Sequence, residues 1–198
     1  MRLFVGIPLA DAATRELAAV VEQLQDAGRE KGRTAVGLRW STPDSWHITL
    51  QFLGNATEEQ LECLKARLGE VRAAAVPVKL GELGCFDRAG VFFADVTVTP
   101  ELAALERSVV AATGRCGFAE EARPLHPHIT LARAKGDARR AGLRELLSLV
   151  PKNLVFQAFA AHEILLYESH LGAGGARYEA RMRVALAGSW GPMAGGND

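Results

Sequence analysis

The chain has 198 residues, of which 48% are hydrophobic and 23% are charged, so it is long enough to bury a substantial core and lacks the composition of a disordered or fibrous protein. Acidic and basic residues balance at 23 each, which excludes a uniformly basic surface that would attract nucleic acid over the whole molecule. Any contact with RNA must therefore be local.

The N-terminal residues predict a cytoplasmic protein. The apolar stretch that begins at Leu3 is short, contains Gly6 and Pro8, and runs into Asp11, which is typical of a first β-strand and not of a secretory signal. No segment approaches the roughly 18 apolar residues of a membrane span, so no membrane contact is expected. The Gly-rich segment 188–198 predicts a flexible tail after one domain of residues 1–187.

The three cysteines predict reduced thiols. Cys63, Cys85 and Cys116 are odd in number, far apart in the sequence, and without CxxC spacing. This pattern argues against both a disulfide framework and a zinc site built from cysteines.

Strands and helices are expected to alternate along the chain. In chain order we expect a strand at 3–7, a helix from Asp11 towards Gly28, strands at 38–41 and 46–53, a helix that begins at the capping box Thr57-Glu58-Glu59-Gln60, strands at 76–83 and 90–99, a helix that begins at Pro100, the strand that contains His128, a helix at about 137–149, and strands at 154–160, 163–169 and 178–186. The GxG pattern of a dinucleotide-binding fold is missing after the first strand. We therefore favour an α+β fold of two lobes over a doubly wound sheet.

The most informative feature is a repeated tetrapeptide. His-Ile-Thr-Leu occurs at 47–50 and again at 128–131, and Pro43 and Pro124 each precede a repeated histidine by four residues. The chain has only five histidines, and two of them share this context. The repeat indicates a duplicated unit with one histidine in each copy.

Strand geometry brings the polar residues of each copy together. Residues two apart in a strand point to the same side, so we expect His47, Thr49 and Gln51 on one face, and His128 and Thr130 on the matching face of the second copy. If the two lobes pack their sheets together, the repeated strands lie side by side. The histidines and threonines then converge on one groove.

Two opposed imidazoles suit an in-line displacement at phosphorus. One neutral histidine accepts the proton of the attacking oxygen and one protonated histidine donates a proton to the leaving oxygen, each transfer being worth about 10²- to 10⁴-fold. A single histidine in a strand is more often structural, so the pairing supports the catalytic interpretation. The motifs bring no carboxylate at ligand spacing and threonine is a poor zinc ligand; we expect neither a metal nor a cofactor.

Together with their flanks, these motifs resemble the 2H phosphoesterase superfamily, and within it the bacterial and archaeal RNA 2′,3′-cyclic phosphodiesterases, once called 2′-5′ RNA ligases. The resemblance spans nearly the whole chain. It rests on the segments 1–7 (MRLFVGI), 39–40 (RW), 46–54 (WHITLQFLG), 123–133 (RPLHPHITLAR), 166–171 (LYESHL) and 175–178 (GARY).

The resemblance implies both a fold and a reaction. The fold would be two pseudo-symmetric lobes, each an antiparallel sheet with helices outside, around a central groove. The reaction would open a terminal 2′,3′-cyclic phosphate to a 2′-phosphomonoester, with His47 as proton donor, His128 as proton acceptor, and Thr49 and Thr130 binding phosphate oxygens. The two copies of the motif do not by themselves distinguish donor from acceptor.

Further residues are candidates for substrate binding. Arg133 occupies a position where the family commonly has a basic residue that suits phosphate recognition, although strict alternation points it away from His128. Phe52 holds the matching place in the first motif, and Phe52, Trp46 or Trp40 could stack on a base. His126 is expected in a loop, outside the chemistry. Lys135, with Arg139 and Arg140, forms a basic cluster that either contacts an RNA backbone or is simply solvated.

Three functions remain open from the sequence. The first is metal-independent hydrolysis of RNA 2′,3′-cyclic phosphate ends or small cyclic nucleotides. The second is the reverse reaction, 2′-5′ RNA ligation, which would run without ATP because no GxxxxGK loop is present. The third is a non-catalytic RNA- or nucleotide-binding module. The internal duplication makes a monomer sufficient, so no obligate protein partner is expected.

Overall fold

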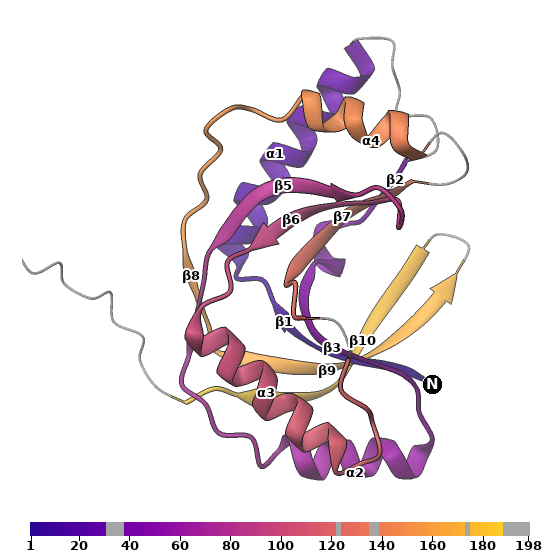
Figure 1. The fold of residues 1–198 in the computed structure, drawn as a ribbon, viewed down its shortest axis with the longest axis vertical. Helices are drawn as coiled ribbons and strands as arrows, with labels where there is room; N and C mark the ends of the chain where they lie inside the picture. Colours follow the sequence, from indigo (N-terminus) through magenta and orange to yellow (C-terminus); the bar gives the residue numbers. More distant parts are fainter. Residues whose placement is uncertain (31–37, 122–123, 135–138, 173–174, 188–198) are drawn as a thin grey trace, which may run out of the picture.

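The computed structural model describes residues 1–30, 38–121, 124–134, 139–172 and 175–187. Two four-stranded antiparallel sheets dominate these residues, and four helices flank the sheets (Figure 1). This arrangement confirms the expected α+β fold with antiparallel sheets. The tail 188–198 lies outside the described residues, so the proposed domain boundary stays a prediction.

The first sheet holds the first copy of the motif. Its strand order is β10-β9-β1-β3. The strands are β1 (Arg2–Pro8), β3 (His47–Asn55), β9 (Glu163–Gly172) and β10 (Gly175–Ala185). The sheet therefore joins the N-terminal third of the chain to its last two strands, and β3, which begins at His47, lies at one edge.

The second sheet holds the second copy. Its strand order is β2-β7-β6-β5, from β2 (Leu38–Trp40), β7 (His128–Ala134), β6 (Val91–Val96) and β5 (Leu80–Phe86). The motif strand β7 is an interior strand here, because β2 pairs with its outer side. The two motif strands, β3 and β7, contact each other, as two lobes packed through their sheets require.

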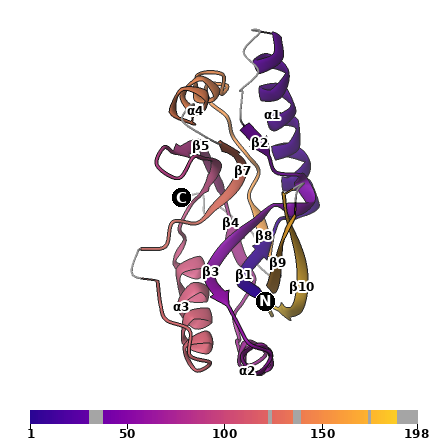
Figure 2. The same ribbon diagram turned by 90° about the vertical axis from the view of Figure 1, so that its right-hand side faces the viewer.

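Two helices lie beside each sheet. α2 (Glu58–Leu68) and α3 (Pro100–Gly114) lie beside the first sheet, whereas α1 (Asp11–Glu30) and α4 (Arg139–Ser148) lie beside the second (Figures 1 and 2). The capping box predicted at Thr57 is present, since its side chain accepts from the Gln60 backbone N–H and the Gln60 side chain accepts from the Thr57 backbone N–H. No helix in the described ranges is long and apolar enough to span a membrane.

Two predicted strands differ from the observed ones. The segment 76–83 divides into β4 (Val76–Val78) and the start of β5, because β4 pairs with β8 (Phe159–Ala161) while β5 pairs with β6. The segment 154–160 is mostly irregular and only its end belongs to β8. Its apolar residues misled the prediction: Val155 is 84% exposed.

The prediction of reduced cysteines is wrong for two of the three. Cys63 in α2 and Cys116 just after α3 form a disulfide, with their Cα atoms 5.8 Å apart. The two helices contact each other, so packing brings together thiols that are 53 residues apart in the sequence. Cys85 is the remaining free cysteine.

A buried polar contact fixes β3 to α3. The Thr113 hydroxyl donates to Gln51 Oε1 at 2.7 Å, and Gln51 Nε2 donates to the Ala119 carbonyl at 3.2 Å. Both side chains are almost fully buried. A buried acceptor that loses its donor retains the cost of its lost hydration.

Thr113→Val should therefore destabilise the protein by about 1 to 2 kcal/mol, because Gln51 Oε1 loses its buried donor while the side-chain volume hardly changes. Urea unfolding monitored by tryptophan fluorescence measures this difference. Ser108→Ala is the matched control, since Ser108 lies on the same helix and its hydroxyl is exposed. Equal stability of the Thr113→Val variant and the wild type would contradict the prediction.

Candidate active site

The same irregularity occurs in both motif strands. Where β3 pairs with β1, Thr49 is opposite Gly6 and Gln51 is opposite Val5, which leaves Leu50 without a partner. Where β7 pairs with β6, Leu131 is left out in the same way. A one-residue bulge of this kind reverses the alternation of side chains beyond it.

The bulges decide which residues reach the groove. Leu50 and Gln51 are both buried, as are Leu131 and Ala132. The prediction that Gln51 shares a face with His47 is therefore wrong, because the bulge turns Gln51 towards α3. The residue that follows each buried pair is exposed and lies on the histidine side of its strand.

Arg133 is one of these two exposed residues, and the other is Phe52. Strict alternation would have turned Arg133 away from His128, but the bulge at Leu131 brings it back. Both residues line a groove of about 350 Å³ together with His47 and His128. The full lining is Arg2, Leu3, Phe4, Arg39, Ser41, Ser45, His47, Thr49, Phe52, His128, Thr130, Arg133, Ser169, Ala176 and Tyr178.

His47 lies among aromatic rings. Its ring centre is 4.6 Å from that of Phe4 and 4.8 Å from that of Tyr178, and its Nδ1 lies 2.8 Å from the Ser45 carbonyl oxygen. Because a carbonyl can only accept, Nδ1 carries the proton and Nε2 remains available for chemistry. Burial, together with the nearby positive charges of His128 and Arg133, lowers the pKa of His47 to about 4, against the raising effect of the Ser45 carbonyl.

His128 repeats this arrangement. Its Nδ1 lies 2.8 Å from the carbonyl oxygen of His126, two residues earlier, just as Ser45 precedes His47 by two. Phe86 flanks the ring edge-on at 5.1 Å. Burial lowers the pKa of His128, and the positive charges of His126 and Arg133 act in the same direction. Both histidines therefore present an unprotonated Nε2 at neutral pH when no anion is bound.

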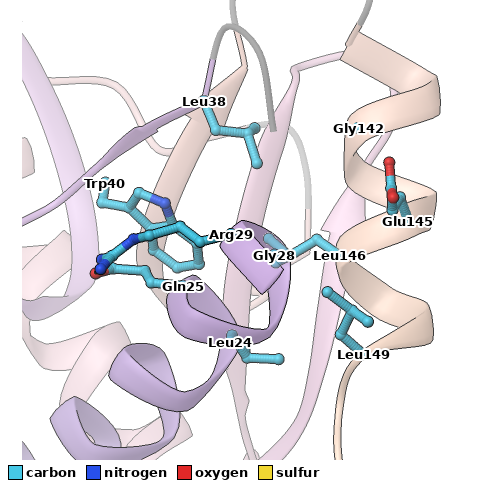
Figure 3. Close-up of a pocket in the computed structure, with 10 residues that line it drawn as sticks. All are labelled: Leu24, Gln25, Gly28, Arg29, Leu38, Trp40, Gly142, Glu145, Leu146 and Leu149. Carbon is cyan, nitrogen blue, oxygen red and sulfur yellow. The ribbon is translucent and has the colours of Figure 1, made fainter. Parts of the chain in front are cut away.

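Two of the three aromatic candidates lie away from the groove lining. Trp46 is 5% exposed and packs in the core, so it offers no face to a base. Trp40 lines another cavity, of about 250 Å³, between α1 and α4, where its ring lies next to Gln25 and Arg29 (Figure 3). The ring also packs edge-on against Phe92. Phe52, which is 55% exposed, is the aromatic candidate on the histidine side.

The other histidines lie outside the groove lining. His126 is in a loop, as expected, and its carbonyl accepts from His128 Nδ1. Its Nε2 lies 3.0 Å from an Asp95 carboxylate oxygen, and the residue lines a neighbouring cavity, not this groove. In the described part of the chain, one group of possible metal ligands, Glu168, His170 and Glu179, has its ligand atoms within 4.8 Å of one another. Lys135 and the side chains of Arg139 and Arg140 lie outside the described residues.

Sequence reasoning missed several lining residues. Arg39, Tyr178 and Ser169 all line the groove. Their segments resemble the family, but no short motif marks them. Arg39 reaches the groove because β2 pairs with β7, and the other two because β9 and β10 complete the first sheet. Only the strand order could have revealed them.

Comparison with known families agrees with this geometry. The model of the 2′-5′ RNA ligase superfamily matches residues 13–172, which includes both histidine motifs. The chain belongs to this superfamily. The match confirms the resemblance that the sequence motifs indicated.

Individual members of the 2′-5′ RNA ligase superfamily are similar to this chain over most of their length. The RNA 2′,3′-cyclic phosphodiesterase of Escherichia coli (strain K12) is 31% identical over 147 residues, which cover 72% of this chain and 77% of that protein. The enzyme of the same name from Bacillus subtilis (strain 168) is 31% identical over 135 residues, covering 66% and 69%. The crystal structure of E. coli LigT complexed with 3′-AMP has a TM-score of 0.67 at 26% identity and covers 94% of this chain and 98% of that one.

Proposed function

We propose that the protein is an RNA 2′,3′-cyclic phosphodiesterase that hydrolyses a terminal 2′,3′-cyclic phosphate to a 2′-phosphomonoester. The observation that carries the proposal is the matched pair of histidines, each with Nδ1 held by a backbone carbonyl two residues earlier and Nε2 left for proton transfer. The names of the similar proteins from Escherichia coli and Bacillus subtilis support the same activity.

In the proposed reaction, His128 Nε2 accepts a proton from water as the water oxygen bonds to phosphorus. The bond from phosphorus to the 3′ oxygen breaks in line with this attack, and protonated His47 donates its Nε2 proton to that oxygen. Donor and acceptor are assigned by resemblance to the family. Both transfers use the nitrogen that the backbone carbonyls leave free.

The donor must be protonated although burial lowers its pKa in the free protein. A bound phosphate supplies the missing charge, because an anion within a few ångströms favours the imidazolium form and offsets the positive charge of Arg133. Substrate binding thus favours the protonated form of His47. Thr49 and Thr130, one on each motif strand, are the proposed hydrogen-bond donors to the non-bridging oxygens, with Arg133 as the cationic partner.

A second cavity offers room for the nucleoside. It has a volume of about 480 Å³, borders the groove at Thr49, Phe52 and His128, and includes the apolar side chains of Phe86 and Leu125. The exposed ring of Phe52 lies where the two cavities meet. A base in this cavity would stack on Phe52 while its cyclic phosphate lies between the histidines.

Three further expectations belong to the proposal. The reaction proceeds without a metal ion or cofactor, since the described residues that line the groove offer histidines, hydroxyls and guanidiniums and no carboxylate or thiol. A monomer suffices, because one chain supplies both histidines. The protein acts in the cytoplasm.

2′-5′ ligation is the second candidate, and the description of the superfamily favours it. In this reaction the 5′-hydroxyl of a second RNA attacks the cyclic phosphate in place of water, so His128 would accept the proton of that hydroxyl and His47 would again protonate the leaving 3′ oxygen. A purely binding module is disfavoured, since binding alone does not require two imidazoles in matching geometry.

Incubation with an oligonucleotide that ends in a 2′,3′-cyclic phosphate should yield a 2′-phosphate end, resolved from the 3′ isomer by chromatography. EDTA should leave the rate unchanged. A 3′-phosphate product, or no product, contradicts the proposed hydrolysis, and a rate that falls with EDTA and recovers with a divalent ion contradicts metal independence. Adding an RNA with a 5′-hydroxyl end to the same assay shows whether ligation accompanies hydrolysis.

A further inference from the structure

Arg39 lies beside the groove in a position that the proposed hydrolysis does not use. β2 pairs with β7 so that Arg39 is directly opposite Arg133, and both exposed side chains line the groove. The Cβ atoms of directly opposed residues lie about 4.5 to 5.5 Å apart, and like charges placed there repel each other. The pair therefore costs stability unless an anion binds beside it.

No carboxylate in the described ranges offsets this repulsion. Elsewhere in the protein an arginine next to an acid forms an ion pair, as Arg181 does with Glu168 at 2.6 Å. Arg39 and Arg133 form no ion pair or side-chain hydrogen bond with any residue that the structure describes. Two uncompensated guanidinium groups beside a reaction groove are typical of a site that binds anions.

A smaller cavity of about 80 Å³ extends the groove past Arg39. Its lining adds Trp40, Thr42 and Gly175 at the start of β10. Among the described residues that line it there are hydroxyls and guanidiniums and no carboxylate. A Cβ placed on Gly175 would lie 3.8 Å from the guanidinium carbon of Arg39. The start of β10 therefore bounds this cavity next to Arg39.

The two sides of the histidines differ in charge. The cavity proposed for the base is lined by two carboxylates, Glu106 and Glu121, and one guanidinium, Arg88, whereas the described residues on the side of Arg39 bring only positive charge. Arg133 is on β7, the strand that contains His128, whereas Arg39 is on β2, one strand farther out. Arg39 is therefore on the side of the groove that favours a second anion.

A terminal cyclic phosphate carries one negative charge, for which Arg133 is sufficient. An RNA chain brings a second phosphodiester one nucleotide away. We propose that Arg39 binds the phosphodiester that precedes the terminal cyclic phosphate, so that the enzyme selects RNA ends over cyclic mononucleotides. This inference rests on the proposed hydrolysis and names its substrate class.

The test compares three substrates. Adenosine 2′,3′-cyclic phosphate has no second phosphate, a diadenosine with a 2′,3′-cyclic phosphate end has one, and its methylphosphonate-linked analogue replaces that charge by a neutral group. Steady-state kinetics are measured for the wild type, for Arg39→Gln, and for Arg15→Gln, a control at an exposed arginine of α1. Thermal melts confirm that each variant is folded.

The wild type should prefer the charged dinucleotide to the mononucleotide by at least about tenfold in kcat/KM. Arg39→Gln should lower kcat/KM for the charged dinucleotide about 10- to 100-fold more than for the mononucleotide, mainly through KM, as expected for one charge-assisted hydrogen bond to phosphate. For the wild type, kcat/KM for the methylphosphonate-linked dinucleotide should be lower than for the charged dinucleotide by the same factor. For Arg39→Gln, the two dinucleotides should differ little in kcat/KM. Arg15→Gln should match the wild type.

Equal losses on mononucleotide and dinucleotide would overturn the inference, because Arg39 would then serve the reacting phosphate. Unchanged kinetics on both substrates would overturn it as well, since Arg39 would then bind neither phosphate. A wild type that opens none of the three substrates would instead overturn the proposed hydrolysis.

Discussion

Replacing either histidine by asparagine should lower kcat by about 10² to 10⁴ while KM changes by less than tenfold. The asparagine side-chain NH₂ can take the place of Nδ1–H and still donate to the carbonyl of Ser45 or His126, but no atom replaces Nε2. Each variant thus keeps the local structure and loses one proton transfer, which is worth that factor. Single-turnover kinetics with a cyclic-phosphate oligonucleotide measure the chemical step.

The double variant, with both histidines replaced, sharpens this prediction. Groups that act in one step are not additive, so the double variant should be little slower than the worse single variant. His162→Asn is the control, because His162 is exposed and does not line the groove. A kcat within threefold of the wild type in either single variant would exclude that histidine from acid–base catalysis.

The free protein should lose stability as the pH falls from 6.5 to about 4, and His47 should account for up to about 3 kcal/mol of the loss. Its pKa is 6.5 in the unfolded chain and about 4 in the folded protein. Above pH 6.5 the imidazole is neutral in both states and contributes no pH dependence. Below pH 6.5 the unfolded chain binds the proton first, which favours unfolding by about 1.4 kcal/mol per pH unit until the folded form also protonates.

Urea unfolding of the wild type and of His47→Asn across this pH range isolates the contribution of His47, because the carboxylates are common to both proteins. The figure of 3 kcal/mol is an upper bound, since the side of the ring that lines the groove contacts solvent. The wild type should lose stability more steeply than the variant. Parallel pH profiles would show that the folded protein does not hold His47 neutral. A bound phosphate should flatten the wild-type profile, because an anion raises the folded pKa.

The sequence predicted the motif strands and their helices well because local signals define them. Apolar alternation, the capping box at Thr57 and the proline at Pro100 all act within one turn or strand. The repeat also predicted correctly that the two motif strands lie side by side. These features depend on residues close in the sequence, which periodicity can detect.

What the sequence could not give depends on partners far along the chain. The bulge at Leu50 arises from pairing with β1 and the bulge at Leu131 from pairing with β6, so strict alternation misplaced Gln51 and Arg133. Trp46 is adjacent to a groove residue yet is buried in the core. The Cys63–Cys116 disulfide follows from helix packing that no cysteine spacing reveals.

The strand order also has a consequence for folding. The N-terminal segment supplies β1 and β3 to one sheet and β2 to the other, and β9 and β10 return from the C-terminal end to complete the first sheet. Neither lobe is a contiguous piece of chain, so the sequence repeat does not correspond to two independently folding units. Contacts of such large sequence separation form slowly, because the intervening loops must close first. During synthesis, the groove can assemble only after the strand that ends at Ala185 has left the ribosome.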